Sequence, residues 1–354
     1  MAMKTVLILE PYAGDSHLQL VRGMQRWLPF AFRVITMPAR KWKWRMRGAA
    51  LHLATLLAAE APADVLFCSS LLSLTDLVAL GPRWLRDARK VVYFHENQFV
   101  YPRRLYKEWD FHFALTNLTT ALAADAVVFN SAFNRDSMLE GVPKLLKKFP
   151  DFRLHGVEQR VAEKSHVLPV PLDPSEFPPP QPKQGAIRIV WNHRWEHDKD
   201  PQTFFTALFA LQEQGVPFSL CVLGQRFKES EKIFDQARER LAAQIAHWGY
   251  AESRSEYLRL LATGDVVVST ALQEFFGVAV LEAVRAGCFP MVPNRLVYPE
   301  LYPSTCLYEE GTLVDKLVWA SECVAHLRAQ DFTCLARPFD WQYWVNAYCH
   351  VLQG

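Results

Sequence analysis

The stretch PVPLDPSEFPPPQP, residues 169–182, holds seven of the chain's 22 prolines in fourteen positions. Proline fixes φ and lacks a backbone donor, so such a stretch is extended and stiff. It divides a chain of 354 residues into two lengths that can each bury a core of their own. We therefore expect a proline-rich linker at 173–185, between an N-terminal domain of residues 1–172 and a C-terminal domain of residues 186–335.

Short apolar runs alternate with helical patterns on both sides of this linker. The runs are TVLILE, FRVITMP, DVLFCSS, KVVYFHE, DAVVFNS and SHVLPVP before it, and AIRIVWNH, FSLCVLG, IAHWGY, DVVVST and FPMVP after it. Continuous apolar strands separated by helices are typical of parallel sheets covered on both faces. The predicted fold is α/β, with two Rossmann-like domains that face each other across a cleft. The tail, residues 336–354, is expected to form a helix that packs back toward the first domain.

Composition excludes several classes of protein. Half of the residues are hydrophobic, which is typical of a globular chain. The first residues, MAMKTVLILEPYAGD, contain too short an apolar run for a signal peptide, and no run reaches the length of a membrane span, so a soluble cytoplasmic protein is expected. Seven scattered cysteines without a C-x-x-C pair argue against a disulfide framework and against a zinc site.

The small net charge of +2 hides an asymmetry. Residues 1–150 carry 20 Lys and Arg against 12 Asp and Glu, a balance of +8, whereas the remainder carries 19 against 25, a balance of −6. A basic half joined to an acidic half suggests that the first half meets a polyanion. The alternative is an uneven surface charge with no partner.

Ligands of parallel sheets bind at the carboxyl ends of the strands, so the residues after each strand are the candidates for a site. The first strand ends in PYAGDSH, whose lone Gly14 disfavours a nicotinamide site of the G-x-G-x-x-G type and is predicted to let a donor approach the backbone. Ser16 and Gln19 match a capping box for the next helix. The fourth strand ends in YFHENQ, which brings His95 to the mouth of the expected cleft; a buried, satisfied histidine is the alternative.

The second half begins with a strand that leads into WNHRWEHDKDP. Asp200 before Pro201 is a good N-cap, so the positive end of a helix is expected beside Arg194 and Lys199. Two cations at a helix N-terminus suit a diphosphate. The acids at 198 and 200 do not indicate a metal motif, because a lysine separates them and the cap accounts for the second.

The stretch EFFGVAVLE places Glu274 and Glu282 eight residues apart after the strand DVVVST. Gly277 stands at the expected start of a helix, so the N–H groups of Gly277 and Val278 are predicted to face an anion or a sugar hydroxyl. Glu274 in the loop can accept hydrogen bonds from a sugar, and Glu282 in the helix can reach a ribose diol.

In these features the sequence resembles the retaining glycosyltransferases of GT-B fold that share an E-x7-E motif. The stretches MPARKWKWR, YFHENQ, HRWEHDKDP and EFFGVAVLEAV are similar to those of the tRNA-queuosine α-mannosyltransferase family in particular. The resemblance spans both halves of the chain. It implies GDP-mannose as donor and, as acceptor, the cyclopentene diol of queuosine at the wobble position of tRNA-Asp.

The same resemblance implies roles for individual residues. Arg194 and Lys199 would bind the diphosphate, Glu274 the donor sugar and Glu282 the ribose, while His95 would face the transferred sugar. No metal or other cofactor would be required, because cations and helix N-termini can stabilise the departing diphosphate. Retention without an obvious nucleophile suggests departure and attack on one face of the sugar, with a donor phosphate oxygen taking the acceptor's proton.

An RNA acceptor gives the basic half a purpose. The stretch RKWKWRMR, residues 40–47, offers cations for phosphates and aromatic rings for bases. The residues predicted to bind tRNA are Arg40, Lys41, Trp42, Lys43, Trp44, Arg45, Arg47, Arg103 and Arg104. The alternative for 40–47 is the start of an amphipathic helix with tryptophans in the core; the two tryptophans are two residues apart, so even then one should stay outside.

Two other functions remain open at this point. A GT-B enzyme could act on a lipid or polysaccharide at an anionic membrane, with the basic half as its anchor. A non-catalytic RNA-binding protein could keep the fold without the activity. No protein partner is predicted.

Overall fold

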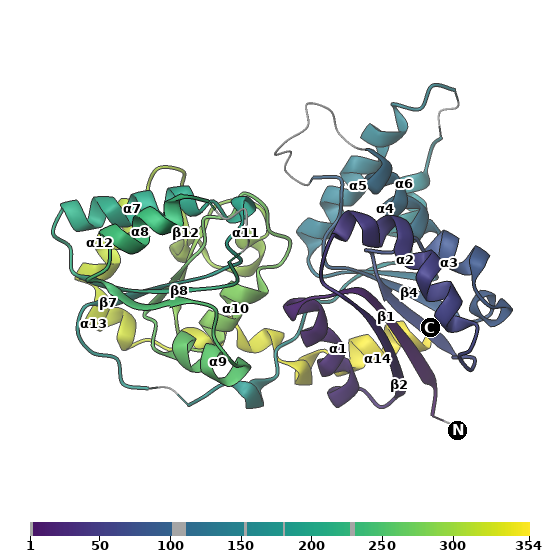
Figure 1. The fold of residues 1–354 in the computed structure, drawn as a ribbon, viewed down its shortest axis with the longest axis horizontal. Coiled ribbons are helices and arrows are strands. Elements are labelled where there is room, and N and C mark those ends of the chain that lie inside the picture. Colours follow the sequence, from purple (N-terminus) through teal and green to yellow (C-terminus); the bar gives the residue numbers. More distant parts are fainter. Residues whose placement is uncertain (1–2, 101–110, 152–153, 180, 227–230) are drawn as a thin grey trace. The chain divides into compact units, whose positions relative to one another are not determined.

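The computed structural model describes residues 3–100, 111–151, 154–179, 181–226 and 231–354, with only the backbone for Asp15. The chain forms two compact units: unit 1, Met1–Pro171 with Trp341–Gly354, and unit 2, Leu172–Asp340 (Figure 1). Each unit contains a six-stranded parallel sheet. The predicted α/β class with two Rossmann-like domains is confirmed.

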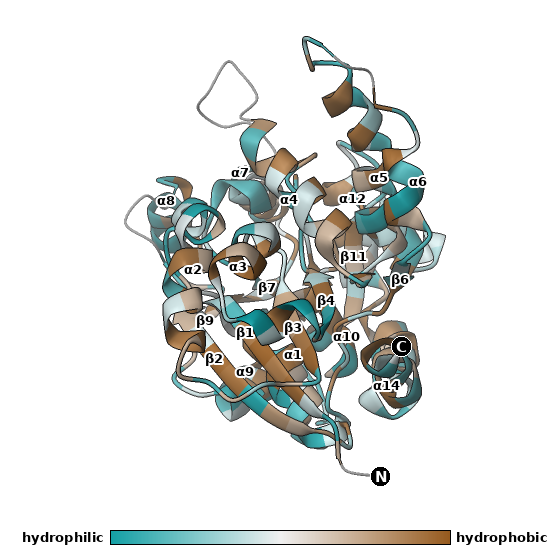
Figure 2. Ribbon diagram, turned by 90° about the vertical axis from the view of Figure 1, so that its right-hand side faces the viewer, coloured by the Kyte–Doolittle hydropathy of each residue, from teal (hydrophilic) through white to brown (hydrophobic). Residues whose placement is uncertain are grey.

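The sheet of unit 1 has the strand order β2-β1-β3-β4-β5-β6. Its strands are β1 (Thr5–Ala13), β2 (Ala31–Pro38), β3 (Val65–Ser69), β4 (Arg89–Phe94), β5 (Ala126–Phe129) and β6 (Ser165–Val167). The strands β3 and β5 are buried along their whole length, and β1, β2 and β3 are largely brown in Figure 2. Helices therefore cover both faces, which is why these runs are apolar at successive positions rather than at alternate ones.

The sheet of unit 2 has the order β12-β11-β10-β7-β8-β9. Its strands are β7 (Ile187–Asn192), β8 (Phe218–Leu223), β9 (Ile245–Gly249), β10 (Val266–Val268), β11 (Phe289–Pro293) and β12 (Leu307–Tyr308). All the predicted runs form strands. Only β12 was not predicted, because its two residues are too few for a sequence pattern.

The helices fill the connections between the strands. In unit 1 they are α1 (Asp15–Trp27), α2 (Trp42–Leu57), α3 (Leu74–Leu80), α4 (Phe111–Ala123), α5 (Ala132–Leu146), α6 (Val157–Ala162) and α14 (Val345–Gln353). In unit 2 they are α7 (Pro201–Glu213), α8 (Ile233–Arg240), α9 (Arg254–Ala262), α10 (Val278–Arg285), α11 (Tyr298–Leu301), α12 (Leu313–Glu322) and α13 (Val324–Arg328). Figure 1 shows α7, α8 and α12 on one face of the second sheet and α9 and α10 on the other.

The proline-rich segment, predicted to be a stiff, extended linker between the domains, is part of unit 2 instead. Asp173 caps a 3-10 turn at Pro174–Glu176, and the ammonium group of Lys183 donates to the carbonyl oxygens of Gly264 and Gly287. Residues after Pro171 therefore belong to unit 2. The prolines keep the segment extended while its polar groups bind to the body of that unit.

The predicted return of the C-terminus to the first domain is confirmed, but its start at residue 336 is wrong. Unit 2 continues to Asp340, whose carboxylate holds Arg285 through two hydrogen bonds of 3.0 and 3.3 Å. Helix α14 then packs on unit 1, where the Tyr348 hydroxyl donates to the Pro169 carbonyl at 2.7 Å and the Arg89 guanidinium donates to the Val351 carbonyl at 3.0 Å.

The Trp341 ring packs so closely on α1 that glycine is required at position 23. A Cβ added at Gly23 would lie well inside van der Waals contact with this ring, which is 1% exposed. We predict that Gly23→Ala lowers the free energy of unfolding by about 1–3 kcal/mol through overpacking. Gly48→Ala is the control, because the atom nearest to an added Cβ there lies 4.0 Å away and alanine favours a helix. Urea unfolding that ranks the two variants in the opposite order would contradict this.

Candidate functional site

Polar side chains gather at the carboxyl end of each sheet, where the strand order reverses. In unit 2 this switch point lies between β7 and β10, and in unit 1 it lies between β1 and β3. Adjacent loops leave the sheet in opposite directions there, which creates the usual ligand site of doubly wound folds. The site residues predicted in the second half of the sequence lie at the switch point of unit 2.

The chain leaves β7 through a tight turn at His193 and Arg194. A Cβ at Gly224, the residue after β8, would overlap the His193 carbonyl group, so glycine is required there. His193 is buried, and burial, followed by the charge of Lys199, lowers its pKa to about 4. Arg194 is exposed, with its guanidinium 3.2 Å from the Glu196 carboxylate. The turn therefore presents a neutral imidazole beside an exposed cation.

Lys199 lies at the centre of the unit 2 site. Its ammonium group contacts the Asp198 carboxylate at 3.1 Å and the Glu274 carboxylate at 3.2 Å, and it donates to the Gln273 carbonyl at 2.9 Å. The Thr270 hydroxyl donates to the Lys199 carbonyl at 2.7 Å. These bonds join the loop after β7 to the loop after β10. The ammonium group of Lys199, in the first loop, is therefore positioned by residues of the second.

Electrostatics keep this ion pair charged at neutral pH. Burial raises the pKa of Glu274, but the charge of Lys199, the neighbouring His193 and the hydrogen bonds to Glu274 together outweigh burial and lower this pKa. Burial alone would lower the pKa of Lys199, but the charges of Glu274 and Asp198 raise it. Ionised groups held in a buried position at the end of a strand are typical of functional sites.

Helix α10 begins beside Glu274. Gly277 is its N-cap with φ of +79°, a conformation that L side chains rarely adopt, and no side chain among the described residues caps this helix. Glu274 accepts hydrogen bonds from the N–H groups of Phe275 and Phe276 at 3.1 and 3.4 Å. The first turn of α10, including Val278, is thus available to an anion or a hydroxyl group.

The N-terminus of α7 is less available than predicted. Asp200 accepts hydrogen bonds from the Thr203 N–H at 3.2 Å and from the Thr203 hydroxyl at 2.7 Å, which confirms its predicted role as N-cap. Its carboxylate consequently lies at the positive end of α7 and competes with any other anion there. Of the two helices, α10 is the better candidate for a phosphate.

Glu282 is buried in α10 and both of its carboxylate oxygens have partners. Arg254 contacts one oxygen at 2.6 Å and the Tyr257 hydroxyl donates to the other at 2.8 Å. The Asn192 amide donates to the same hydroxyl at 3.0 Å. Burial raises the pKa of Glu282, while Arg254 partly opposes this effect. A ribose hydroxyl that binds Glu282 has to share the carboxylate with these two side chains.

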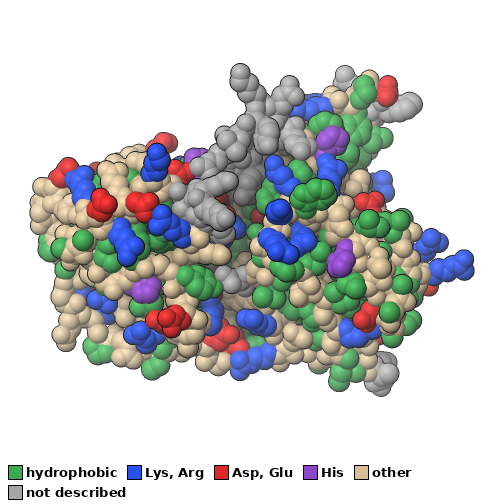
Figure 3. All heavy atoms as spheres, viewed as in Figure 1, with side chains coloured by type: hydrophobic (Ala, Val, Ile, Leu, Met, Phe, Trp, Pro, Cys, Tyr) green, Lys and Arg blue, Asp and Glu red, His purple; other side chains and the backbone are tan. Residues whose placement is uncertain are grey.

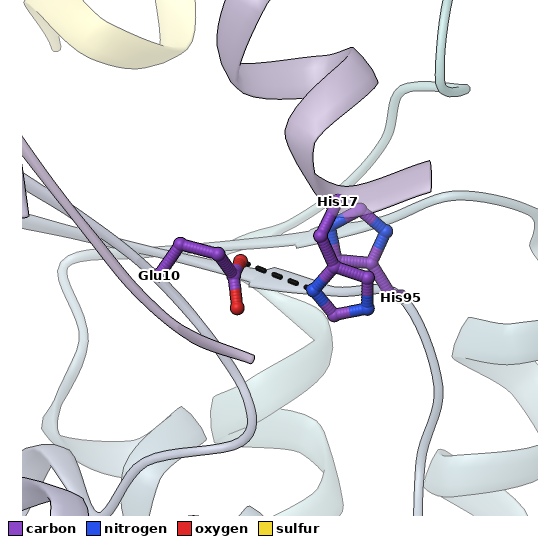
Figure 4. A group of neighbouring side chains, drawn as sticks. All are labelled: Glu10, His17 and His95. Atoms are coloured by element: carbon purple, nitrogen blue, oxygen red, sulfur yellow. Dashed lines mark ion pairs between the residues drawn. The ribbon is translucent and has the colours of Figure 1, made fainter. Parts of the chain in front are cut away.

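Three titratable side chains meet at the switch point of unit 1. Glu10 at the end of β1 lies 3.1 Å from the His17 ring nitrogen Nδ1, and the His17 ring stacks on that of His95 with centroids 3.7 Å apart (Figure 4). Burial, followed by the charge of His17, holds the pKa of His95 well below its usual value. His95 therefore stays neutral at neutral pH.

Buried amides fix the loop that carries His95. The Asn130 amide donates to the His95 carbonyl at 2.8 Å, and the Asn134 amide donates to the Phe94 carbonyl at 2.9 Å. Asn97 is itself buried and bonded to Asn134, so it supports the loop. The predicted position of His95 after β4 is confirmed, and it stacks against His17 rather than lying alone.

The three side chains offer potential metal ligands within 4.8 Å of one another. Their geometry does not suit a metal ion, however. An imidazole binds a metal in the plane of its ring at about 2.0–2.1 Å. The rings of His17 and His95 are stacked at an angle of 19°, so one ion cannot lie in both planes. The cluster is therefore better suited to hydrogen bonding than to coordination.

Gly14 lies in unit 1 and is the N-cap of α1 with φ of −91°, a conformation open to any residue. The nearest atom to an added Cβ is 3.4 Å away, so the structure does not require glycine there. The capping box predicted at Ser16 is wrong, because Ser16 lies inside a helix that begins at Asp15, and no described side chain caps that helix. Gly14 as a donor contact has no support from this geometry.

The basic stretch 40–47 is the beginning of a helix. Lys41 is the N-cap of α2, with φ of +52°, and Trp42 packs in a small core cluster with Met46, Leu71 and Phe113. Trp44 is 72% exposed. The helix of the alternative is thus present, but only Trp42 lies in the core, as expected from the spacing of the two tryptophans.

The cations of this stretch differ in their exposure. Arg40, Lys41, Lys43 and Arg47 are exposed, whereas Arg45 is half-buried and donates to the Pro38 carbonyl at 3.0 Å. Arg47 lies over the Phe113 ring, 5.0 Å from its centroid. Figure 3 shows Lys and Arg side chains on the visible faces of both units.

Not every predicted residue can be placed. Arg103 and Arg104 lie outside the described residues. None of the helices in the described part of the chain combines the length and apolar character that a membrane span requires.

Sequence reasoning missed Glu10, His17, Asp198 and Arg254. Glu10 was read as part of an ordinary strand, and His17 as part of the turn that follows it. The one sequence signal for Glu10 was an acidic residue inside the apolar run TVLILE. Asp198 was set aside as part of a rejected metal motif. Nothing in the sequence around Arg254 predicted its contact with Glu282.

Comparison with known proteins covers both units. Residues 5–172 match the family model for the N-terminal part of tRNA-queuosine alpha-mannosyltransferase, and residues 174–316 match that of glycosyl transferases group 1. The tRNA-queuosine alpha-mannosyltransferase of Drosophila melanogaster is 40% identical over 325 residues, which are 89% of this chain and 86% of the relative.

Solved structures support the fold. The sucrose-phosphate synthase of Thermosynechococcus elongatus has a TM-score of 0.73 at 12% identity, with 99% of this chain and 98% of that chain covered. HepE of Anabaena, solved in complex with UDP, has a TM-score of 0.67 at 13% identity, with 99% of both chains covered. The sequence matches identify the chain as a glycosyltransferase, and it belongs to the tRNA-queuosine alpha-mannosyltransferase family.

Proposed function

We propose that this enzyme transfers mannose, with retention, from GDP-mannose to the cyclopentene diol of queuosine at the wobble position of tRNA-Asp. The observation that carries the proposal is the charged pair of Lys199 and Glu274 beside the start of α10, in a chain of this family. The pair supplies a cation and a hydrogen-bond acceptor next to the backbone donors of that helix. The proposal places the reaction in the cytoplasm.

In the proposed donor complex, unit 2 binds GDP-mannose. Arg194, Lys199 and the N–H groups of Gly277 and Val278 bind the diphosphate, and Glu282 binds the ribose. Glu274 accepts hydrogen bonds from the mannose hydroxyls. Arg194 is exposed and contacts the Glu196 carboxylate, so a phosphate group would compete with that carboxylate for its guanidinium.

Catalysis then rests on charge stabilisation. The bond between the anomeric carbon and the diphosphate breaks while the acceptor oxygen attacks the same face, and a phosphate oxygen of the donor takes the acceptor's proton. The cations and the start of α10 stabilise the negative charge that develops on the leaving group. Neutral His95 faces the mannose as a hydrogen-bonding partner, and no metal ion is needed.

The acceptor tRNA binds unit 1 through the start of α2. Cations at a helix N-terminus are unfavourable for the helix, by about 0.3–1 kcal/mol each. The first turn of α2 contains no acid to offset them. A phosphate group would relieve this repulsion, and the exposed Trp44 ring offers a stacking surface for an unpaired base.

The direct test is mass analysis of tRNA nucleosides after incubation of queuosine-containing tRNA-Asp with the enzyme and GDP-mannose. A hexose added to queuosine, in equal yield with and without EDTA, is expected. Absence of transfer would contradict the proposed function. Transfer that is lost in EDTA would contradict the proposal that no metal ion is needed. Binding to anionic vesicles but not to tRNA would favour the membrane acceptor instead.

Arg194→Ala should weaken GDP binding roughly tenfold, because the variant lacks one charge-assisted hydrogen bond to phosphate. Binding of tRNA should stay unchanged. Arg337→Ala is the matched control, since Arg337 is an exposed arginine of unit 2 paired with Asp331. Isothermal calorimetry that finds the same GDP affinity in the Arg194 variant and the control would contradict the assignment.

Glu274→Gln should lower the rate of transfer by about 10²-fold, because the amide of glutamine forms weaker contacts with the sugar in the transition state. GDP carries no sugar, so its affinity should change less than about threefold. Single-turnover kinetics with calorimetry checks both numbers. A variant that loses GDP affinity and transfer in equal proportion would show that Glu274 serves the nucleotide rather than the sugar.

Replacing Lys43 and Arg47 together by alanine should reduce tRNA affinity and flatten its dependence on salt, by about one unit of slope for each phosphate that the variant no longer neutralises. Arg238→Ala with Arg259→Ala removes the same charge from exposed positions of unit 2 and is the control. Filter binding over a range of salt concentrations measures the slopes. Equal salt slopes in the two double variants would contradict tRNA binding by these cations and leave α2 with a structural role only.

A further inference from the structure

Glu10 is a buried carboxylate at the carboxyl end of β1. It is 3% exposed, and its oxygen Oε1 accepts hydrogen bonds from the Tyr12 N–H at 2.8 Å and the Ser69 hydroxyl at 3.0 Å. These bonds connect β1 to β3 at the switch point of the sheet. Burial of a charged group is unfavourable unless each oxygen has partners. The second oxygen, Oε2, has the His17 ring beside it.

His17 meets this second oxygen without satisfying it. The distance from Nδ1 to Oε2 is 3.1 Å, yet among the described residues none forms a hydrogen bond of good geometry with Nδ1. His17 is only 8% exposed. A polar atom buried to this degree is nearly always hydrogen-bonded in a native protein, and an exception indicates a ligand or a functional site.

The stack of His17 on His95 adds a second polar surface to the same place. The Tyr93 and Tyr12 rings flank it, with centroids 4.6 Å from His95 and 6.0 Å from His17. Figure 4 shows the Glu10 carboxylate directed at the stacked rings. One anion and two imidazoles within 4.8 Å can together accept and donate several hydrogen bonds. The stacked planes do not suit a shared metal ion, whereas hydroxyl groups match the donors and acceptors of the cluster.

We propose that Glu10 and His17 bind the two neighbouring hydroxyl groups of the acceptor and hold the attacking one in place, while His95 keeps its proposed role at the mannose. This inference rests on the proposed function and assigns its diol to named side chains. Glu10 accepts a hydrogen bond from one hydroxyl, and the His17 imidazole forms a hydrogen bond with the other. No proton is transferred to the cluster, so the chemistry of the transfer step is unchanged.

The test compares two tRNA-Asp preparations, one with queuosine and one with unmodified guanosine at the wobble position. Dissociation constants are measured with GDP present, for the wild type and for His17→Ala and Glu10→Gln. The wild type should bind the queuosine tRNA about tenfold more tightly, as expected for hydrogen bonds to a charged group. In both variants this ratio should fall toward one, while affinity for the unmodified tRNA stays unchanged.

Two further readouts separate positioning from folding. Transfer to queuosine tRNA should fall about 10²-fold in the variants. The affinity for GDP should stay within about threefold of the wild type, because GDP carries no sugar to contact His95 and the residues of unit 2 proposed to bind it are untouched. His17→Gln, which keeps a polar group at the position, should recover part of the ratio. His52→Ala, at an exposed histidine of α2, should behave as the wild type.

The outcomes distinguish this inference from the function on which it rests. Wild-type enzyme that transfers mannose, with variants that keep the binding ratio and the rate, overturns the inference alone. Equal affinity of an active wild type for the two tRNAs also overturns the inference. So does an equal loss of affinity for both tRNAs in the variants. A wild type that transfers nothing to queuosine tRNA overturns the proposed function and this inference together.

Discussion

The ion pair of Lys199 with Glu274 is the interaction on which the second unit's site depends. Each partner comes from a different strand end, β7 for Lys199 and β10 for Glu274, and the strand order brings these ends together. A lone charge would be unfavourable at this depth, and Asp198 gives Lys199 a second anionic partner. The pair therefore fixes two loops and keeps both groups ionised, so that the start of α10 faces a preorganised set of charges.

Unit 1 uses the same architecture with a different set of side chains. Glu10 lies in the second half of β1, His193 follows β7, and His95 follows β4. The unit 1 cluster contains a carboxylate and two stacked imidazoles but no lysine. It is suited to hydroxyl groups, whereas the unit 2 site is suited to phosphate. This difference in chemistry supports the proposal that unit 2 binds the donor and unit 1 the acceptor.

Much of this could be predicted from the sequence. The apolar runs predicted the strands because buried parallel strands need no polar face, and Asp200 with Pro201 predicted the start of α7 from local chemistry. The pairing of Lys199 with Glu274 and the contact of Arg254 with Glu282 could not be predicted, since these residues are distant in sequence and meet only through the order of the strands. Segment 173–185 was misread because prolines indicate extension but not what the chain packs against.

Hydrogen–deuterium exchange with each substrate tests the central claim, that donor and acceptor occupy sites built by different units. GDP-mannose should slow exchange at residues 193–200 and in the first turn of α10, and should leave α2 unchanged. Queuosine-containing tRNA-Asp should slow exchange in the first turn of α2 and around Glu10, and should leave α10 unchanged. Protection of α2 by GDP-mannose, or of α10 by the tRNA alone, would contradict the account.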